Sequence, residues 1–242
     1  MKRREILLGG MVLAATGTAA QIYKPEKNVL VGGGHWQAPP TLLPEPVNPG
    51  KLVFFSDAEA KTVSAIFDRL IPADDVSIGA TDAGCTTFID YQLAGAYGKG
   101  VSRYTKGPFQ KGEDYQGDQT ALSPGDWYRK GLPAFDAACQ TAHGKAFIDL
   151  TGDQQDEMLR KLESGAITLP GDLDARKLFQ QFLGNVREGY FADPIYGGNK
   201  GMAGWKMVGF PGALYDYRDY VERKGQKLDI QPVSLIGPIL SA

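Results

Sequence analysis

Residues that carry out catalysis or bind metals are scarce in this sequence, which has two histidines and two cysteines among 242 residues. It contains no zinc-type spacing of cysteine and histidine, and no Cys-x-x-Cys-His motif for covalent haem. The Gly-x-Ser-x-Gly motif of a nucleophilic serine and the Gly-Lys-Ser/Thr of a phosphate-binding loop are also missing. A formal net charge of −2 argues against nucleic-acid binding. The sequence therefore shows no self-sufficient active site.

Alternating runs of β-branched and polar residues are also missing, so the sequence gives almost no signal for strands. With 43% hydrophobic and 22% charged residues, the composition is that of a folded globular protein. The 31 glycines indicate many turns. We therefore predict an all-α fold of about five helices, with long ordered loops and an irregular C-terminal third rich in glycine and aromatic residues.

Five stretches show helical spacing of apolar residues or good helix starts. The predicted helices lie within residues 54–75, 81–96, 123–143, 151–163 and 172–190. The first has a capping box of Ser56 with Glu59, and Pro72 stops it. Ser123, followed by Pro124, starts the third helix. Residues 97–120 show no apolar period and are predicted to form a long loop.

The N-terminus has the layout of an export signal over residues 1–20. Three basic residues precede an apolar run from Ile6 to Ala15, and small residues follow it. The adjacent pair Arg3 and Arg4 favours the twin-arginine route, whereas the alternative is a short anchor helix that is not cleaved. Residues 21–50 are predicted to form an extended arm rich in proline and glycine, followed by a single helical domain, 51–242, with a C-terminal docking segment.

Export to an oxidising compartment would favour a disulfide between Cys85 and Cys139, the alternative being two buried free thiols. His143, at the end of a predicted helix, suits a C-terminal capping role. Paired carboxylates could perform acid–base chemistry, for which Asp74, Asp75 and Asp193 are the candidates.

The stretch FADPIYGGNKGMAGWKMVGFPG, residues 191–212, combines many glycines with large aromatic side chains. Glycine allows close backbone approach, and aromatic residues are favoured in the centres of interfaces. We predict a partner interface here, the alternatives being a loop folded on its own domain and a small-ligand site. Its candidate residues are Tyr190, Phe191, Pro194, Tyr196, Gly197, Gly198, Trp205, Lys206, Phe210 and Pro211.

The run EGYFADPIYGGNKGMAGWKMVGFPGALYDYRD, residues 188–219, resembles the signature of the gluconate 2-dehydrogenase subunit 3 family. The resemblance extends from Phe54 to Leu235. Segments 67–74, 83–95, 104–109, 128–136 and 154–165 are also similar to the family. Cys85 stands where a small aliphatic residue is expected, and Cys139 is likewise outside the pattern, so a shared disulfide does not follow from the resemblance.

The resemblance implies a small, non-catalytic subunit of an oxidoreductase complex at the outer face of the cytoplasmic membrane, in the periplasm. A large partner subunit would bind FAD and oxidise the substrate, and a multihaem cytochrome c subunit would pass electrons onward. This chain would hold no cofactor itself, and would support maturation and export of the large subunit. The substrate could be gluconate, 2-ketogluconate, fructose, sorbitol or glucose, because the large subunit selects it.

Two other functions are compatible with the residues. One is a secreted module that binds a sugar through Trp205 and Tyr196. The other is a stand-alone hydrolase acting on sugars, which would need two or more of the three candidate aspartates in one pocket.

Overall fold

The structure is a computed structural model that describes residues 44–104, 106–110, 112–113, 120–226 and 228–236. Residues 1–43, with the predicted signal and most of the predicted arm, lie outside these ranges. The described residues fall into two compact units, a larger one within His35–Tyr215 and Gly225–Ala242, and a smaller one within Asp216–Lys224. Within the described residues of the smaller unit, 216–224, the regular element is the 3₁₀ turn η7, Arg218–Tyr220.

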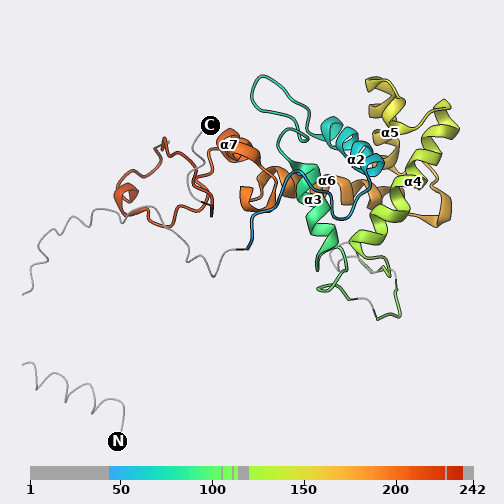
Figure 1. The fold of residues 1–242 in the computed structure, drawn as a ribbon, viewed down its shortest axis with the longest axis horizontal. Helices are drawn as coiled ribbons and strands as arrows, with labels where there is room; N and C mark the ends of the chain where they lie inside the picture. The colour runs from blue at the N-terminus through green and yellow to red at the C-terminus, as the bar shows by residue number, and fades with distance from the viewer. Residues whose placement is uncertain (1–43, 105, 111, 114–119, 227, 237–242) are drawn as a thin grey trace, which may run out of the picture. The chain divides into compact units, whose positions relative to one another are not determined.

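The larger unit is helical, which confirms the predicted fold class (Figure 1). Its α-helices are α2 (Asp57–Leu70), α3 (Cys85–Ala94), α4 (Pro124–His143), α5 (Gly152–Ser164), α6 (Ala175–Phe191) and α7 (Ala203–Val208). Short 3₁₀ turns η3 (Phe147–Asp149), η4 (Pro170–Asp172), η5 (Pro194–Tyr196) and η6 (Lys200–Met202) connect them. The β-pairing in the described ranges is one isolated bridge, between Gly212 and Val233. No helix in these ranges has both the length and the apolar content needed to cross a bilayer.

Most helix starts lie where the local sequence predicts them. The Ser56 hydroxyl accepts the Glu59 N–H at 3.3 Å, and the Glu59 carboxylate accepts the Ser56 N–H at 2.8 Å, forming a capping box. Ser123 and Thr151 make equivalent boxes at α4 and α5. The second predicted helix begins later than expected, at Cys85 rather than near residue 81, because residues 81–84 form a turn that precedes it.

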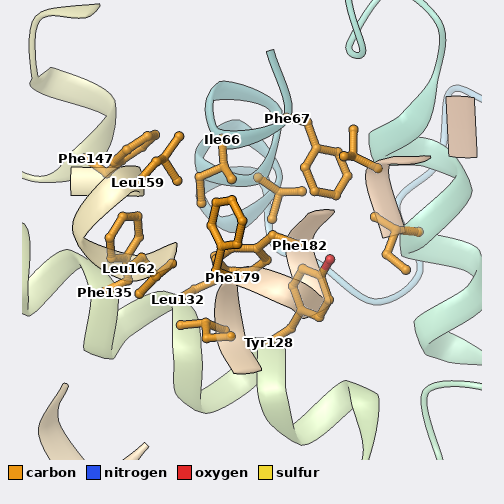
Figure 2. Close-up of a cluster of buried hydrophobic side chains, with 14 of the residues drawn as sticks. Ile66, Phe67, Tyr128, Leu132, Phe135, Phe147, Leu159, Leu162, Phe179 and Phe182 are labelled. Atoms are coloured by element: carbon orange, nitrogen blue, oxygen red, sulfur yellow. The ribbon is translucent and has the colours of Figure 1, made fainter. Parts of the chain in front are cut away.

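The core is built around α6, which packs against α2, α3, α4, α5 and α7. Figure 2 shows aromatic and aliphatic side chains from four helices and η3 pointing toward one another. The labelled residues are Ile66 and Phe67 of α2, Tyr128, Leu132 and Phe135 of α4, Phe147 of η3, Leu159 and Leu162 of α5, and Phe179 and Phe182 of α6. All of them are buried, so this cluster supplies much of the hydrophobic free energy of folding.

The chain before α2 is held by one buried carboxylate. Asp90 of α3 has no exposed surface, and its two oxygens accept the backbone N–H groups of Val53, Phe54 and Phe55 at 2.7, 3.0 and 2.7 Å. These N–H groups belong to no helix and need an acceptor when they leave water. Asp90 therefore fixes the path by which the chain enters the core.

The two cysteines are free thiols, which corrects the predicted disulfide in favour of its alternative. The residues after α3 meet the first turn of α4, where the Gly125 N–H donates to the Gly98 carbonyl at 2.9 Å. Cys85 lies at the opposite, N-terminal end of α3, and Cys139 lies about 21 Å further along α4. A disulfide requires the two Cα atoms to lie within about 7 Å of each other.

We expect Asp90→Asn to lower the free energy of unfolding by about 2 kcal/mol, because an amide nitrogen in place of one carboxylate oxygen cannot accept a buried backbone N–H. Urea unfolding of the purified chain measures this. The exposed Asp82 gives a matched control, and Asp82→Asn should change stability by less than about 0.5 kcal/mol. Equal effects of the two variants would contradict the role assigned to Asp90.

Burial raises the thiol pKa values of Cys85 and Cys139 to about 12, with smaller contributions from Asp68 and Asp136, respectively. Because the thiolate is the reactive form, neither native thiol should react with Ellman's reagent at pH 8. Unfolding in urea without reductant should expose two reactive thiols per chain. If unfolding released no thiol until a reductant was added, the cysteines would be bonded and the structural assignment would fail.

Candidate partner-binding surface

The glycine-aromatic segment, residues 191–212, lies in the C-terminal third that was predicted to be irregular, and it contains three short helical elements. It leaves the end of α6 at Phe191 and passes through η5, η6 and α7. Within it Ile195, Met202 and Trp205 are at most 5% exposed. Tertiary packing of these three apolar side chains orders a sequence whose glycines alone would disfavour helix.

Asn199 clamps the segment from inside. It has no exposed surface, and its side-chain amide donates to the Ala192 carbonyl while its carbonyl oxygen accepts the Gly204 N–H, both at 2.9 Å. Its backbone is left-handed, with φ of 47°, a conformation that asparagine tolerates better than most residues. Trp205 adds a second tie, because its indole N–H donates to the Phe191 carbonyl at 2.8 Å. The start of the segment and α7 are thus held together.

The segment's glycines bring its backbone onto its own domain. A Cβ atom on Gly198 would overlap the backbone of Gly189 in α6. At the adjacent turn the Lys200 N–H donates to the Ala83 carbonyl at 3.0 Å, and the Val47 N–H donates to the Ile195 carbonyl at 3.1 Å. The sequence suggested that these glycines let the backbone approach a partner closely. In the structure they let it approach the chain's own helices.

The structure divides the ten candidate interface residues into three groups. Tyr190, Gly198 and Trp205 are buried within this chain, so they support a surface and do not form one. Pro194, Gly197 and Pro211 are half-buried. Phe191, Tyr196, Lys206 and Phe210 are exposed.

Several large apolar side chains near the buried Trp205 are exposed to solvent. Phe191 is 38% exposed, Met207 42%, Val208 57% and Phe210 48%. The Phe210 ring packs edge-on against the indole, with ring centroids 5.3 Å apart. We call Phe191, Met207, Val208 and Phe210, with the neighbouring Lys206, the α7 surface. Grouped exposed apolar side chains of this kind are typical of interaction sites.

The sequence did not identify Met207 and Val208 as surface residues. Their exposure follows from α7, a helix of six residues that turns Gly204 and Trp205 inward and leaves Lys206, Met207 and Val208 outside. Helical periodicity could have shown this, but the glycines on either side argued against a helix there.

Two of the three candidate catalytic carboxylates, Asp74 and Asp193, accept hydrogen bonds from backbone N–H groups. One oxygen of Asp193 accepts the Ile195 N–H at 3.0 Å, and the other accepts the Leu235 N–H at 2.8 Å. Asp74 accepts the N–H groups of Val76 and Ser77 at 2.9 and 2.8 Å, which closes the turn after α2. Asp75 is exposed in the same turn. Within the described ranges no three acidic, histidine or cysteine side chains are grouped as metal ligands.

The other candidate sites also have local structural roles. Trp205 is 5% exposed, so its ring is not available to stack on a sugar beside Tyr196, as the sugar-binding alternative required. His143 is the last residue of α4, the position that the predicted C-terminal capping role requires. Its Nε2 lies 3.8 Å from a carboxylate oxygen of Glu157.

We expect Asn199→Ala to destabilise the segment by about 2 kcal/mol, because it leaves the Gly204 N–H and the Ala192 carbonyl unpaired and puts a less suitable residue at positive φ. Hydrogen exchange should rise in residues 192–208 and stay unchanged in α5. The exposed neighbour is the control, and Lys200→Ala should leave both regions unchanged. Unaltered protection of 192–208 in Asn199→Ala would disprove the clamp.

Comparison with known proteins yields one match. The model of the family described as gluconate 2-dehydrogenase subunit 3 matches residues 57–212, which is 156 of the 242 residues. The match spans α2 to α7 and ends just after the α7 surface. No curated protein and no solved structure matches the chain. The chain belongs to the gluconate 2-dehydrogenase subunit 3 family and is, by that membership, a subunit of a dehydrogenase complex.

Proposed function

We propose that this chain is the non-catalytic small subunit of a periplasmic, membrane-bound dehydrogenase that converts D-gluconate to 2-dehydro-D-gluconate. In this proposal the large subunit binds FAD and oxidises the substrate, and a multihaem cytochrome c subunit accepts the electrons. The chain described here holds no cofactor and contributes a binding surface. Family membership carries the proposal, because it identifies the chain as one subunit of a dehydrogenase complex.

The α7 surface is the proposed contact with the large subunit. Its four apolar side chains are 38% to 57% exposed, whereas Trp205 and Asn199 beneath them are held by hydrogen bonds and packing. Such a surface is rigid before the partner arrives, so little conformational entropy is lost on binding. Lys206 at its edge adds a positive charge that would help to orient an acidic partner.

The proposed role in export follows from the order of folding and transport. A flavoprotein must fold around FAD in the cytoplasm, and the twin-arginine route carries folded cargo. A large subunit without its own signal could therefore cross the membrane while bound to this chain, using Arg3 and Arg4 as the address. That requires a tight complex before transport, and hence a sizeable apolar interface.

The complex is tested by capture through a C-terminal tag from detergent-solubilised membranes. A flavin absorbance spectrum and gluconate-dependent dye reduction are then recorded. Co-purification of a yellow, gluconate-oxidising chain supports the proposal. A colourless single chain would refute it. Replacing Arg3 and Arg4 with Lys tests export, since the flavoprotein should then remain in the cytoplasm.

We expect Met207→Asp to reduce the captured flavin and the dye-reduction activity at least about tenfold, because a charge would be buried in the interface without a partner. Met207 is already 42% exposed, so the melting temperature of the free subunit should be unchanged. Ile148, 43% exposed and the middle residue of η3, is the matched control. Equal loss in Met207→Asp and Ile148→Asp would argue against docking at α7.

A further inference from the structure

A groove runs along the outer side of α4. Three adjoining hollows of about 470, 380 and 300 Å³ form it. The first and second share Ala137 and Pro170, and the first and third share Lys130, Gly171 and Leu173. Because the hollows share lining residues, they make one continuous depression between α4 and the chain that connects α5 to α6.

One wall of the groove is a helical stripe. Trp127, Lys130, Ala134, Ala137 and Thr141 line it, spaced three or four residues apart on α4. The stripe is about 21 Å long, which is the length of about six residues in an extended conformation. Its alanines and threonine are small, so the wall is set back and leaves room for another chain.

The opposite wall is residues 166–174, which connect α5 to α6. Its larger apolar lining side chains are Ile167, Pro170 and Leu173, and Pro170 and Leu173 each line two of the three hollows. The centre of the groove is therefore apolar on both sides. A groove of this kind suits a polypeptide better than a small polar molecule, because it is long and open and its polar lining residues are spread along its length.

The rim of the groove is basic. Arg129, Lys130, Lys161 and Lys177 line the three hollows, against one acidic lining residue, Asp174. The whole chain has the opposite balance, with 26 basic and 28 acidic residues. Among its lining residues the groove therefore has more basic than acidic side chains, whereas the whole chain has slightly more acidic ones.

Part of that charge is already paired within the chain. Arg129 contacts Glu59 and Lys161 contacts Glu157, each at 2.6 Å. Asp174, the acidic lining residue, is the N-cap of α6, and its carboxylate accepts the backbone N–H of Lys177 at 3.2 Å. This bond does not involve the charged end of Lys177.

Lys130 lines two hollows from the middle of the stripe and is exposed. It has an acidic neighbour in Asp126, one turn earlier on α4, whose pKa is lowered mainly by hydrogen bonds from Ser123 and to a smaller extent by the Lys130 charge. Its position in two hollows makes it the basic side chain best placed to meet an incoming carboxylate.

We propose that this groove binds an extended, acidic segment of a second protein chain. The apolar walls take the segment's aliphatic side chains, and the basic rim takes its carboxylates. Charge complementarity selects the occupant, because a basic segment would be repelled by the rim and a neutral one would leave it unmatched.

The groove is distinct from the α7 surface. Leu173 and Asp174 precede the first turn of α6, whereas Phe191 is its last residue, and the 17 residues of α6 separate them by about 25 Å. Both surfaces belong to the larger unit. The chain could thus hold two partner segments at once, and the groove's role does not depend on which protein docks at α7.

Photocross-linking tests the proposal in the full chain. The photoreactive residue p-benzoylphenylalanine replaces Ala137 in the groove, the producing cells are irradiated, and the attached peptide is sequenced by mass spectrometry. We expect attachment to another chain, within a segment where Asp and Glu outnumber Lys and Arg. Attachment only to this chain's own residues, to a second copy, to lipid or to a neutral or basic segment would overturn the proposal. So would the absence of any cross-link.

Charge and space in the groove are then varied separately. Lys130→Glu should reduce the cross-link yield at least about fivefold by charge repulsion, and added salt should weaken the wild-type cross-link. Lys145→Glu, an equal charge change just beyond α4, should have no effect. In a binding competition, Ala137→Trp should release the same partner, whereas Gln140→Trp, exposed on α4 outside the hollows, should retain it. Equal behaviour of each variant and its control would refute the groove assignment.

A second attachment position separates this inference from the proposed function. The same photoreactive residue at Met207 reports on the α7 surface. A flavoprotein cross-link at Met207 with none at Ala137 would uphold the proposed function and refute the groove. A cross-link to an acidic segment at Ala137, without a flavoprotein cross-link at Met207, would uphold the groove proposal and refute docking of the flavoprotein at the α7 surface.

Discussion

The structure depends on the close packing of α6 against each of the other α-helices described in the larger unit. One central helix can pack against five others only if the helices approach one another closely. Gly189 of α6 shows how close this approach is. A Cβ atom there would lie 3.0 Å from the ring of Phe88 and 3.2 Å from the Cα atom of Cys85. A side chain at this position would push α3 away from α6, and with it the chain segments held by Asp90. The α7 surface begins at Phe191, where α6 ends, so its position depends on the same packing of α6 against α3.

Long non-helical connections create a second requirement, which is to pair backbone groups that no helix satisfies. Three polar side chains do much of this at separate points. Asp90 holds the chain before α2, Asn199 holds the glycine-aromatic segment, and Asp193 joins that segment to the C-terminal tail at Leu235. Two of these three side chains, Asp90 and Asn199, have no exposed surface. Asp193, which the sequence offered as a catalytic candidate, is thus engaged in maintaining the fold.

In the described residues these polar groups serve the fold, which agrees with the proposed non-catalytic role of the chain. What it presents to other molecules is surface of two kinds. The α7 surface is apolar with a lysine at its edge, and the α4 groove is apolar with a basic rim. Surfaces of different character at the two ends of α6 suit a subunit that contacts more than one partner. Substrate selection and electron transfer would then belong to those partners.

The sequence by itself determined five of the six described α-helices, α2 to α6, and most of their starts, because a capping box such as Ser56 with Glu59 is formed by residues three positions apart. It also determined the family, through the run around ADPIYGGN. Only the tertiary structure decided which aromatic residues are accessible. Trp205 and Phe210 are equally plausible interface residues in the sequence, but the indole is covered by Phe210 and tied to Phe191, whereas Phe210 stands half in water. The fate of Cys85 and Cys139 was likewise decided by the relative placement of two helices. Burial and pairing of this kind depend on residues far apart in the chain, and local sequence patterns carry no information about those distances.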